Sequence, residues 1–336
     1  MTGQGTRPLI TVLGASGLLG TAVSRELAAR PMRLRLVGRR PTAVPAHPAA
    51  SVEVRTTDLA EPGAVADAVA DADAVIHLVA HTAGPGTWRV AAGDTLAERV
   101  NLGLVHDVIE AIRAQRRARP PALLFAGSIS QAARVPSDGT VGAADQPPTA
   151  YDRQKLAAEQ AIAAATAEEV VRGSTLRLAT LYSLGTDAPD LDRGVVATMT
   201  RRAVAGQPLT MWHEGTAKRD LLSVDDTARA FTAALDSIDA VAGHHWEIGT
   251  GEQTSVADLF AMIAEAVAAR TGRPPVPVVS TPPAEYSMPT DRLDFVLKSS
   301  AFREATGWRP LVPVREGVDR LAAAVARETV AVQVSR

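Results

Sequence analysis

A tyrosine and a lysine stand four residues apart in Tyr151–Glu169, whose pattern predicts a helix. Tyr151 and Lys155 then lie on the same face of that helix. A tyrosine with an ordinary pKa near 10 is a poor acid or base at neutral pH, and an adjacent ammonium group favours the phenolate. The pair therefore predicts proton transfer to or from a substrate oxygen. The alternative is a surface helix pair without chemistry.

Two serines follow the apolar run Ala122–Ala126, which predicts a buried strand. In a doubly wound sheet, ligands bind beyond the carboxyl ends of the strands. Ser128 is therefore placed to donate a hydrogen bond to a substrate carbonyl oxygen, with Ser130 as the alternative donor. Either serine alone could instead cap a turn.

Three glycines separate the predicted strand Leu9–Leu13 from the predicted helix Leu18–Arg30. The first permits a tight turn, the second lets backbone N–H groups approach a pyrophosphate, and the third lets the helix pack closely on the strand. The N-terminus of the helix favours an anion. The segment predicts a dinucleotide site, against the alternative of a glycine-rich turn without a ligand. The predicted site residues here are Gly14, Ser16, Gly17, Leu18, Leu19 and Gly20.

Two arginines end the second predicted strand, where NAD enzymes usually carry an acidic residue for the ribose 2′-hydroxyl. Arg39 and Arg40 can instead clamp a 2′-phosphate by charge-assisted hydrogen bonds, so we expect NADP(H). The alternative is a solvated basic loop. Asp58, at the end of the third β unit, is expected either to accept from the adenine amino group or to cap the following turn.

Short apolar runs alternate with helical patterns through the first half of the chain, which predicts an α/β fold. We expect a Rossmann-type, doubly wound parallel sheet with right-handed crossovers. Beyond about residue 180, prolines interrupt shorter elements, and a smaller α/β substrate domain is expected. The predicted domains are 1–180 with about 223–249, which carries the dinucleotide motif, and 181–222 with 250–330, which would bind the substrate. The remaining predicted strands are Arg33–Val37, Val52–Arg55, Ala74–Val79, Ser174–Leu178 and His244–Ile248, and the remaining predicted helices are Pro62–Ala72, Asp94–Arg117 and Val224–Leu235.

Composition excludes several classes of function. The 336 residues carry a net charge of −2, which argues against a nucleic-acid partner. No cysteine is present, so disulfides, thiolate metal sites and cysteine nucleophiles are excluded. Adjacent His244 and His245 face opposite sides of a strand and cannot chelate together, so no metal is expected. No apolar stretch is long enough for a membrane span, and a cytoplasmic location is expected.

Taken together, these motifs resemble the extended short-chain dehydrogenase/reductase superfamily, in its NAD-dependent epimerase/dehydratase branch. More narrowly, the chain resembles actinomycete 4-ketoreductases that act on NDP-4-keto-6-deoxyhexoses in antibiotic deoxysugar biosynthesis. The broad likeness lies in Gly14–Gly20, Asp58-Leu59, His77–Ala80, Asn101, Ser128, Tyr151–Lys155, Arg219–Asp226 and Trp308–Pro310, and the narrow one in Ala80–Gly84, Thr87–Arg89 and Leu209–His213.

The resemblance implies a role for each matching residue. Tyr151 would be the proton donor, Ser128 would polarise the carbonyl, and Lys155 would bind the nicotinamide ribose and lower the pKa of the tyrosine. Asn101 would support the active-site helix. Cofactor contacts would also come from Leu59, Leu78, Ala80, Asn101, Tyr151 and Lys155, and substrate contacts from Trp88, Arg89, Ser128, Ser130, Trp212 and Arg219, the last at the nucleotide diphosphate.

Three departures from the family pattern bear on function. Tyr182-Ser183 replaces a common Tyr-Gly-Pro, and Ser223 replaces a common histidine. The segment Ser128–Ser130 lacks the Asp-Glu pair that sugar dehydratases need, which counts against a dehydratase. We expect NADPH-dependent reduction of the 4-keto group of a nucleotide-activated, dTDP-linked 4-keto-6-deoxyhexose. The alternatives are a sugar-nucleotide epimerase with bound NAD and a non-catalytic NADP-sensing regulator.

The helices Asp94–Arg117 and Tyr151–Glu169 are both long and largely apolar on one face. Relatives pair such helices into a four-helix bundle, so a homodimer is expected. The sequence leaves open which sugar and base are bound, whether the keto group is at C3 or C4, and the stereochemistry of the product.

Overall fold

A computed structural model describes residues 7–81, 90–91, 93–132, 147, 149–185, 192–283 and 289–334. Its centre is a seven-stranded sheet in the order β11-β6-β5-β4-β1-β2-β3. Every pair of neighbouring strands in this sheet is parallel, which confirms the predicted doubly wound fold. The strands are β1 (Leu9–Leu13), β2 (Arg33–Gly38), β3 (Ser51–Thr56), β4 (Ala74–His77), β5 (Ala122–Ser128), β6 (Arg172–Leu178) and β11 (His245–Ile248).

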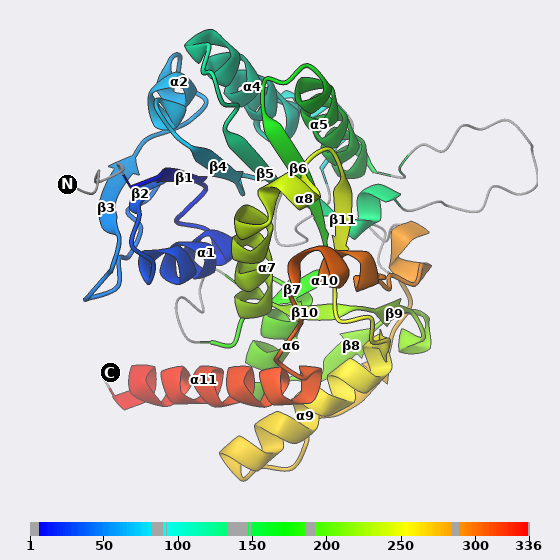
Figure 1. The fold of residues 1–336 in the computed structure, drawn as a ribbon. Helices are drawn as coiled ribbons and strands as arrows, with labels where there is room; N and C mark the ends of the chain where they lie inside the picture. The colour runs from blue at the N-terminus through cyan, green and yellow to red at the C-terminus, as the bar shows by residue number, and fades with distance from the viewer. Residues whose placement is uncertain are drawn as a thin grey trace, which may run out of the picture.

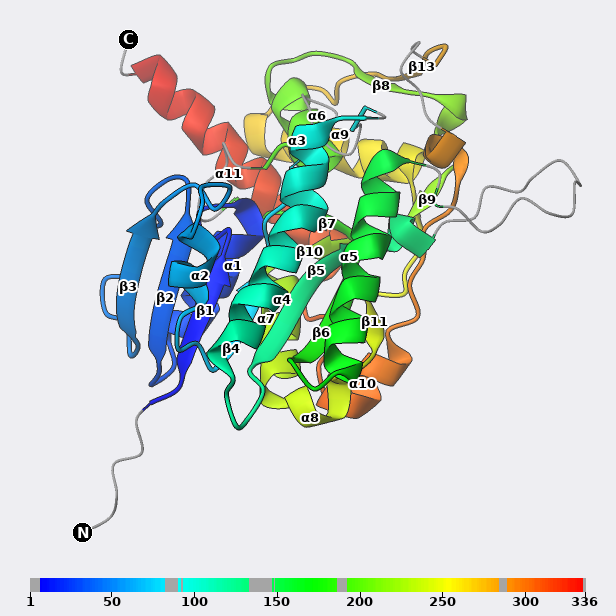
Figure 2. The ribbon, with the colours of Figure 1, turned by 90° about the horizontal axis from the view of Figure 1, so that it is seen from above.

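Helices cover both faces of this sheet (Figures 1 and 2). Side chains alternate between the faces along each strand, so Leu124 packs on the side of α1 and α7, whereas Leu123 and Phe125 pack on the side of α4 and α5. Strands buried on both faces read as continuous apolar runs, which is why the sequence identified them. The helices are α2 (Ala64–Val69), α4 (Leu104–Gln115) and α5 (Ala150–Ala167) on one face and α1 (Leu18–Ala28), α7 (Val224–Asp236) and α8 (Ile238–Val241) on the other.

A further group of helices lies beyond α7, around its own apolar cluster (Figure 1). The helices are α6 (Val195–Val204), α9 (Val256–Thr271) and α11 (Val314–Val334). Three two-stranded sheets accompany them, β7 (Thr180–Tyr182) with β10 (Leu221–Ser223), β8 (Leu209–Met211) with β13 (Val278–Ser280), and β9 (Lys218–Arg219) with β12 (Thr254–Ser255). None of the helices within the described ranges is long and apolar enough to cross a membrane.

The predicted helix Asp94–Arg117 is helical without a break from Thr95 to Gln115, with a π-helical turn inside it. It consists of α3 (Thr95–Glu98), the π-helical turn η2 (Arg99–Gly103) and α4. The Leu104 N–H donates to the carbonyl of Arg99, five residues back, which marks the extra residue in the turn. Apolar periodicity does not reveal a single inserted residue, and such bulges are frequent at functional sites.

The two-domain division stays a prediction. α7 and β11, within residues 223–249, lie in the layers of the central sheet. Leu297, Phe302 and Trp308 also pack into the core on the α1 and α7 side of the sheet, although they fall within the range predicted for the second domain. Phe302 belongs to the short helix α10 (Ser300–Thr306). The two parts of the chain therefore interleave more closely than the predicted boundaries suggest.

A buried carboxylate connects α7 to the segment that leads into α11. Asp226 is 0% exposed and accepts hydrogen bonds from the backbone N–H groups of Leu311 at 2.7 Å and Val312 at 3.1 Å. Ser223, the N-cap residue of α7, donates to the same side chain at 2.8 Å, and Arg229 pairs with it. The serine that replaces the family's histidine thus caps a helix.

We expect Asp226→Ala to lower the free energy of unfolding by about 3–5 kcal/mol, because it leaves several buried donors without an acceptor. Asp258→Ala is the matched control. Asp258 has the same spacing from the N-cap Ser255 of α9, but it is exposed. Its loss should cost no more than about 1 kcal/mol. Equal losses in urea titrations of the two variants would contradict this account.

Candidate active site

The glycine-rich turn is fixed by close backbone contacts. Gly14 has φ +86°, and a Cβ atom there would lie 3.1 Å from the backbone of Leu78 in the loop after β4. A Cβ at Gly20 would lie 2.0 Å from the carbonyl oxygen of Gly14, so α1 approaches the turn as closely as predicted. Gly17 is the N-cap residue of α1, and no side chain caps this end of the helix. The first N–H groups of α1 are therefore left for an anion.

A cavity of about 580 Å³ opens at this turn, along the carboxyl ends of β1, β2, β3 and β4. Of the two predicted cofactor residues in the body of α1, Leu19 packs against the core and Gly20 contacts the turn. The predicted cofactor residues that line the cavity are Gly14, Ser16, Gly17, Leu18, Arg39, Arg40, Asp58, Leu59, Leu78 and Ala80.

The charges that line the cavity are mostly positive. Arg40 donates to the carbonyl oxygen of Ser16 at 3.2 Å, and Arg39 is exposed beside it. Asp58 accepts from the Ala60 N–H at 2.9 Å, so it caps the turn while also lining the cavity. It is the only acidic side chain among the described residues of the lining.

Arg193 is a lining residue that sequence reasoning missed. It is the only described lining residue beyond residue 104, and it precedes Gly194, the N-cap residue of α6. Its neighbour Asp192 is buried and accepts from the N–H groups of Ser183 and Gly194, both at 2.8 Å, which fixes the backbone on either side. No motif marks this arginine, because only the tertiary fold brings it to the cavity.

The cavity suits a nicotinamide dinucleotide. The uncapped helix N-terminus and the glycine turn can receive the pyrophosphate, and Arg39 and Arg40 can receive phosphate at the adenosine end. The glycines are required sterically by this structure, independently of any bound group.

Lys155 is buried against the carboxyl end of β5. Its side chain is 2% exposed, and its ammonium donates to the carbonyl oxygen of Ala126 at 2.9 Å. It lies 4.5 Å from the ring centre of Phe125 and 5.7 Å from that of Tyr151. Burial lowers the pKa of Lys155 to about 7, because desolvation disfavours the charged form.

Tyr151 lies one turn before Lys155 at the start of α5. Burial and, to a smaller extent, the adjacent carboxylate of Asp152 raise the pKa of Tyr151 above its usual 10.0. The phenol of Tyr151 is therefore protonated at neutral pH. The expectation that Lys155 lowers the pKa of Tyr151 stays a prediction.

The structure brings both predicted serines to the start of α5. The Ser128 and Ser130 hydroxyl oxygens are 2.8 Å apart, and Ser130 donates to Asp152 at 2.5 Å. Asp152 also accepts from the hydroxyl of Thr149, the N-cap residue of α5, at 2.6 Å. Sequence reasoning missed Asp152, although it stands directly beside Tyr151.

Two amide side chains fix the elements around this cluster. Asn101, buried in the π turn η2, accepts from the His81 N–H at 2.7 Å and donates to Gln154 of α5 at 2.8 Å. Gln131, in the 3₁₀ turn η3 (Ile129–Ala132), accepts from the Ser128 N–H at 2.9 Å and donates to Glu159 of α5 at 2.7 Å. These hydrogen bonds connect the loop after β4 and the end of β5 to α5, the helix that carries Tyr151 and Lys155.

His77 stands beside the site without taking part in its hydrogen bonds. It is 1% exposed, and neither ring nitrogen has a partner among the described residues. Its ring packs edge-on against Phe125, with the ring centres 5.6 Å apart. Burial first, and the charge of Lys155 second, lower the pKa of His77 to about 3. The imidazole is therefore neutral and adds no charge that competes with Lys155.

The predicted substrate residues are placed only in part. Arg219 lies in β9, where its guanidinium donates to the carbonyl of Asp291 at 3.1 Å and stacks on Phe295 at 5.1 Å from the ring centre. Burial lowers the pKa of Arg219 from its usual value. Trp212 is half-buried just after β8. Trp88 and Arg89 lie outside the described residues.

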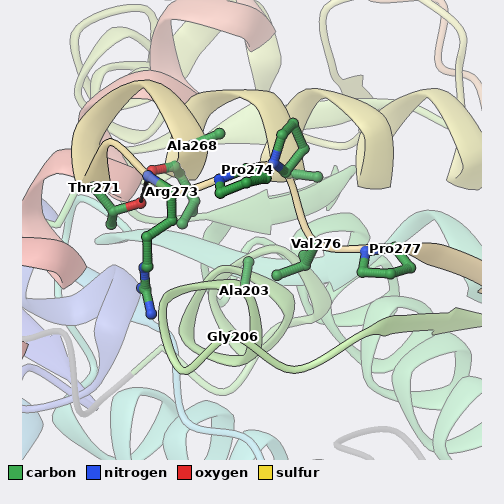
Figure 3. A pocket seen from close by; sticks show the side chains of 11 residues that line it. Ala203, Gly206, Ala268, Thr271, Arg273, Pro274, Val276 and Pro277 are labelled. Atoms are coloured by element: carbon green, nitrogen blue, oxygen red, sulfur yellow. Dashed lines mark hydrogen bonds between the residues drawn. The ribbon is translucent and has the colours of Figure 1, made fainter.

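A second cavity of about 300 Å³ lies between α6, α9 and the proline-rich segment 273–277 (Figure 3). Arg273 closes one end by donating to the carbonyl oxygen of Val204 at 2.5 Å. None of the predicted site residues lines this cavity. Within the described ranges, no cluster of His, Asp and Glu side chains is arranged to hold a metal ion.

Comparison with known proteins extends these observations. The model of the NAD dependent epimerase/dehydratase family matches residues 10–249. The chain is 25% identical to a dTDP-L-rhamnose 4-epimerase of Burkholderia thailandensis, over 95% of each chain. It is 26% identical to a dTDP-6-deoxy-L-talose 4-dehydrogenase (NAD(P)(+)) of Kitasatospora kifunensis, over 96% of this chain and 97% of the relative.

Solved structures share the fold. A UDP-glucose 4-epimerase of Thermus thermophilus in complex with NAD superposes with a TM-score of 0.74 at 24% identity, over 94% of this chain and 98% of the other. At this identity the likeness establishes the fold alone.

The lowered pKa of Lys155 predicts a pH-dependent stability. The folded chain loses this proton near pH 7, whereas an unfolded lysine keeps it to about its usual 10.5. Between these values the unfolded chain binds more protons, so the free energy of unfolding should rise with pH relative to Lys155→Met, by up to ~1.4 kcal/mol per pH unit. Urea titrations from pH 6 to 9 measure this slope. Lys298→Met, at an exposed lysine, is the control and should follow the wild type. Parallel curves for wild type and Lys155→Met would refute the buried ammonium.

Proposed function

Because the chain belongs to the NAD-dependent epimerase/dehydratase family, we propose that it is an NADPH-dependent reductase of the 4-keto group of a dTDP-linked 4-keto-6-deoxyhexose. The observation that carries this proposal is the pair Arg39 and Arg40 at the dinucleotide cavity, together with Tyr151 and the buried Lys155 on α5. A reductase must exchange its spent cofactor, and selection for the 2′-phosphate lets it draw on the reducing NADPH pool.

The names of the two relatives support the choice of substrate. Both place their reaction at position 4 of a dTDP-linked sugar. A 4-dehydrogenase and a 4-ketoreductase interconvert the same hydroxyl and carbonyl groups in opposite directions. The narrower resemblance to deoxysugar 4-ketoreductases is part of this proposal.

The reaction assigns one task to each residue at the start of α5 and the end of β5. Bound NADPH supplies a hydride to the keto carbon. Tyr151 gives its proton to the carbonyl oxygen as a general acid. Ser128 donates a hydrogen bond to the oxygen as negative charge develops on it. Lys155 holds the nicotinamide ribose and stabilises the tyrosinate left behind, which needs its ammonium charged.

A sugar-nucleotide 4-epimerase is the second candidate, favoured by the epimerases among the relatives. An epimerase returns its hydride to the same sugar, so it consumes no cofactor. A panel of dTDP-linked 4-keto-6-deoxyhexoses and dTDP-linked hexoses, each with NADPH or NAD, separates the candidates. Stoichiometric NADPH oxidation with a new hydroxyl at C4, read by NMR, supports the reductase. Interconversion of the C4 configuration without net cofactor consumption supports the epimerase, and cofactor binding without either reaction supports a regulator.

The proposed homodimer concerns the face of the molecule that carries α4 and α5, which lie side by side (Figure 2). Exposed positions on α5 include Gln160, Ala163 and Ala164. Small side chains on this face permit close approach of helices from a second copy. The dimer stays a prediction.

We expect NADPH selectivity to depend on the two arginines at the end of β2. Replacing Arg39 and Arg40 together by alanine removes the charge-assisted contacts to the 2′-phosphate, each of which contributes about 1.5–3 kcal/mol. NADPH binding should weaken by at least tenfold, and NADH binding should change little. Fluorescence titration with both cofactors measures the two affinities. Equal losses for NADPH and NADH would exclude a 2′-phosphate site here.

The roles of the catalytic residues predict different patterns in three variants. Tyr151→Phe keeps the ring but removes the proton, so kcat should fall by about 10²–10⁴ while NADPH affinity is nearly unchanged. Lys155→Ala should impair both turnover and cofactor binding. Ser128→Ala should act mainly on kcat, because it removes one hydrogen bond to the developing alkoxide. Near-normal turnover in Tyr151→Phe would place the acid elsewhere.

A further inference from the structure

A chain of hydrogen bonds leads from the proposed substrate-polarising serine to a buried carboxylate. Ser128 and Ser130 are 2.8 Å apart, and Ser130 is 2.5 Å from Asp152. Asp152 is 2% exposed and immediately follows Tyr151. These hydrogen bonds therefore begin at the serine proposed to contact the substrate oxygen and end one residue from the proposed acid.

The charge of Asp152 decides which way these hydroxyl groups point. An ionised carboxylate only accepts, so it takes the proton of Ser130. The Ser130 oxygen can then only accept from Ser128, and the proton of Ser128 points away from the substrate. In this arrangement Ser128 has a lone pair for a substrate hydroxyl, but it has no proton for a carbonyl.

A protonated Asp152 reverses the chain. Its O–H donates to Ser130, Ser130 donates to Ser128, and Ser128 is free to donate to a substrate carbonyl oxygen. No proton moves from one residue to another in this reversal beyond the one that Asp152 binds. The hydroxyl groups only rotate.

We propose that Asp152 is a positioning residue which, through Ser130, selects whether Ser128 hydrogen-bonds a ketone or an alcohol. The protonated form of Asp152 favours reduction of the ketone, and the ionised form favours oxidation of the alcohol. This inference rests on the proposed function for its direction of reaction. Asp152 would thus control the direction of the reaction, although it is not one of the three proposed catalytic residues Tyr151, Lys155 and Ser128.

Helix capping alone does not account for this geometry. Thr149 and Asp152 form a cap at α5, as Ser255 and Asp258 do at α9, and each carboxylate uses one oxygen, Oδ2, for its cap. At α5 the other oxygen, Oδ1, receives the Ser130 hydroxyl. The carboxylate of Asp152 thus carries a second bond that the cap does not need.

The groups around Asp152 act on its pKa in opposite directions. Burial raises the pKa of Asp152, while hydrogen bonds from Ser130 and Thr149 and the charge of Arg153 oppose that rise. The elements packed against this end of α5 are η3 and η2, whose other polar groups are engaged elsewhere. They are Gln131 with Glu159, Asn101 with His81 and Gln154, and Arg99 with Asp107, while Lys155 on α5 itself points to Ala126.

Asp152→Asn tests the proposal without removing the cap. The amide oxygen can still accept from Thr149, and the amide nitrogen becomes a permanent donor to Ser130. We expect this variant to keep ketone reduction and to lose at least about tenfold in kcat for alcohol oxidation with NADP. The fall in wild-type reduction as pH rises through the pKa of Asp152 should disappear in the variant.

Two further variants make the result specific. Ser130→Ala interrupts the hydrogen bonds between Ser128 and Asp152. It should therefore also abolish the fall in the rate of reduction as pH rises through the pKa of Asp152. Asp258→Asn alters the equivalent cap at α9 and should leave the profile and both reaction directions at wild-type values. If Asp152→Asn loses reduction and oxidation by the same factor, or if its pH profile follows the wild type, the proposal is wrong.

A readout that needs no turnover separates this inference from the proposed function. Carboxyl ¹³C NMR follows the titration of Asp152, whose signal is assigned by its loss in Asp152→Asn. Ser130→Ala removes a donor to the ionised carboxylate, so the pKa of Asp152 should rise in that variant. An unchanged titration would overturn the hydrogen-bond chain even if the enzyme reduces its ketone. A raised pKa supports the chain even if no ketone in the panel is reduced, an outcome that would count against the proposed function alone.

Discussion

The buried ammonium of Lys155 is the interaction on which the site depends. This ammonium joins α5 to the carboxyl end of β5 by donating to the Ala126 carbonyl oxygen. Among the described residues, no carboxylate pairs with it. A charge in this position is costly, and the backbone carbonyl and the face of Phe125 offset part of that cost. Because the same helix carries Tyr151, this contact sets how far the phenol stands from the strand end that carries Ser128.

The neighbourhood is arranged so that few other charges act on this ammonium. His77, which packs against the same phenylalanine, is held neutral by burial. Glu159, four residues after Lys155 on α5, forms an ion pair with Arg177 and accepts a hydrogen bond from Gln131. Lys155 and Asp152 both lie close to Tyr151 on α5. Burial and, to a smaller extent, the charge of Asp152 raise the pKa of the phenol.

Sequence patterns predicted the centre of the sheet because the strands β1, β4 and β5 are buried on both faces. Such strands are continuous apolar runs, and the parallel order follows from the alternation with helices. The patterns did not predict the one-residue insertion inside the helix 95–115. The π turn at Asn101 lies within that helix, and its extra residue accompanies a fully buried amide that holds the loop after β4. Periodicity over a long helix does not register one inserted residue.

In the candidate site, too, motifs within a few residues were predicted, whereas contacts between residues far apart in the sequence were not. The sequence by itself determined the glycine turn, the arginines after β2 and the spacing of Tyr151 and Lys155, because each is a local pattern whose chemistry depends on neighbours within a few residues. Only the tertiary structure decided that Arg193 reaches the dinucleotide cavity from beyond β7, and that Asp152 meets Ser130 across 22 positions of sequence. It also decided the sign of the pKa shift of Tyr151. Desolvation depends on everything that surrounds a group, and no spacing of residues along the chain records it.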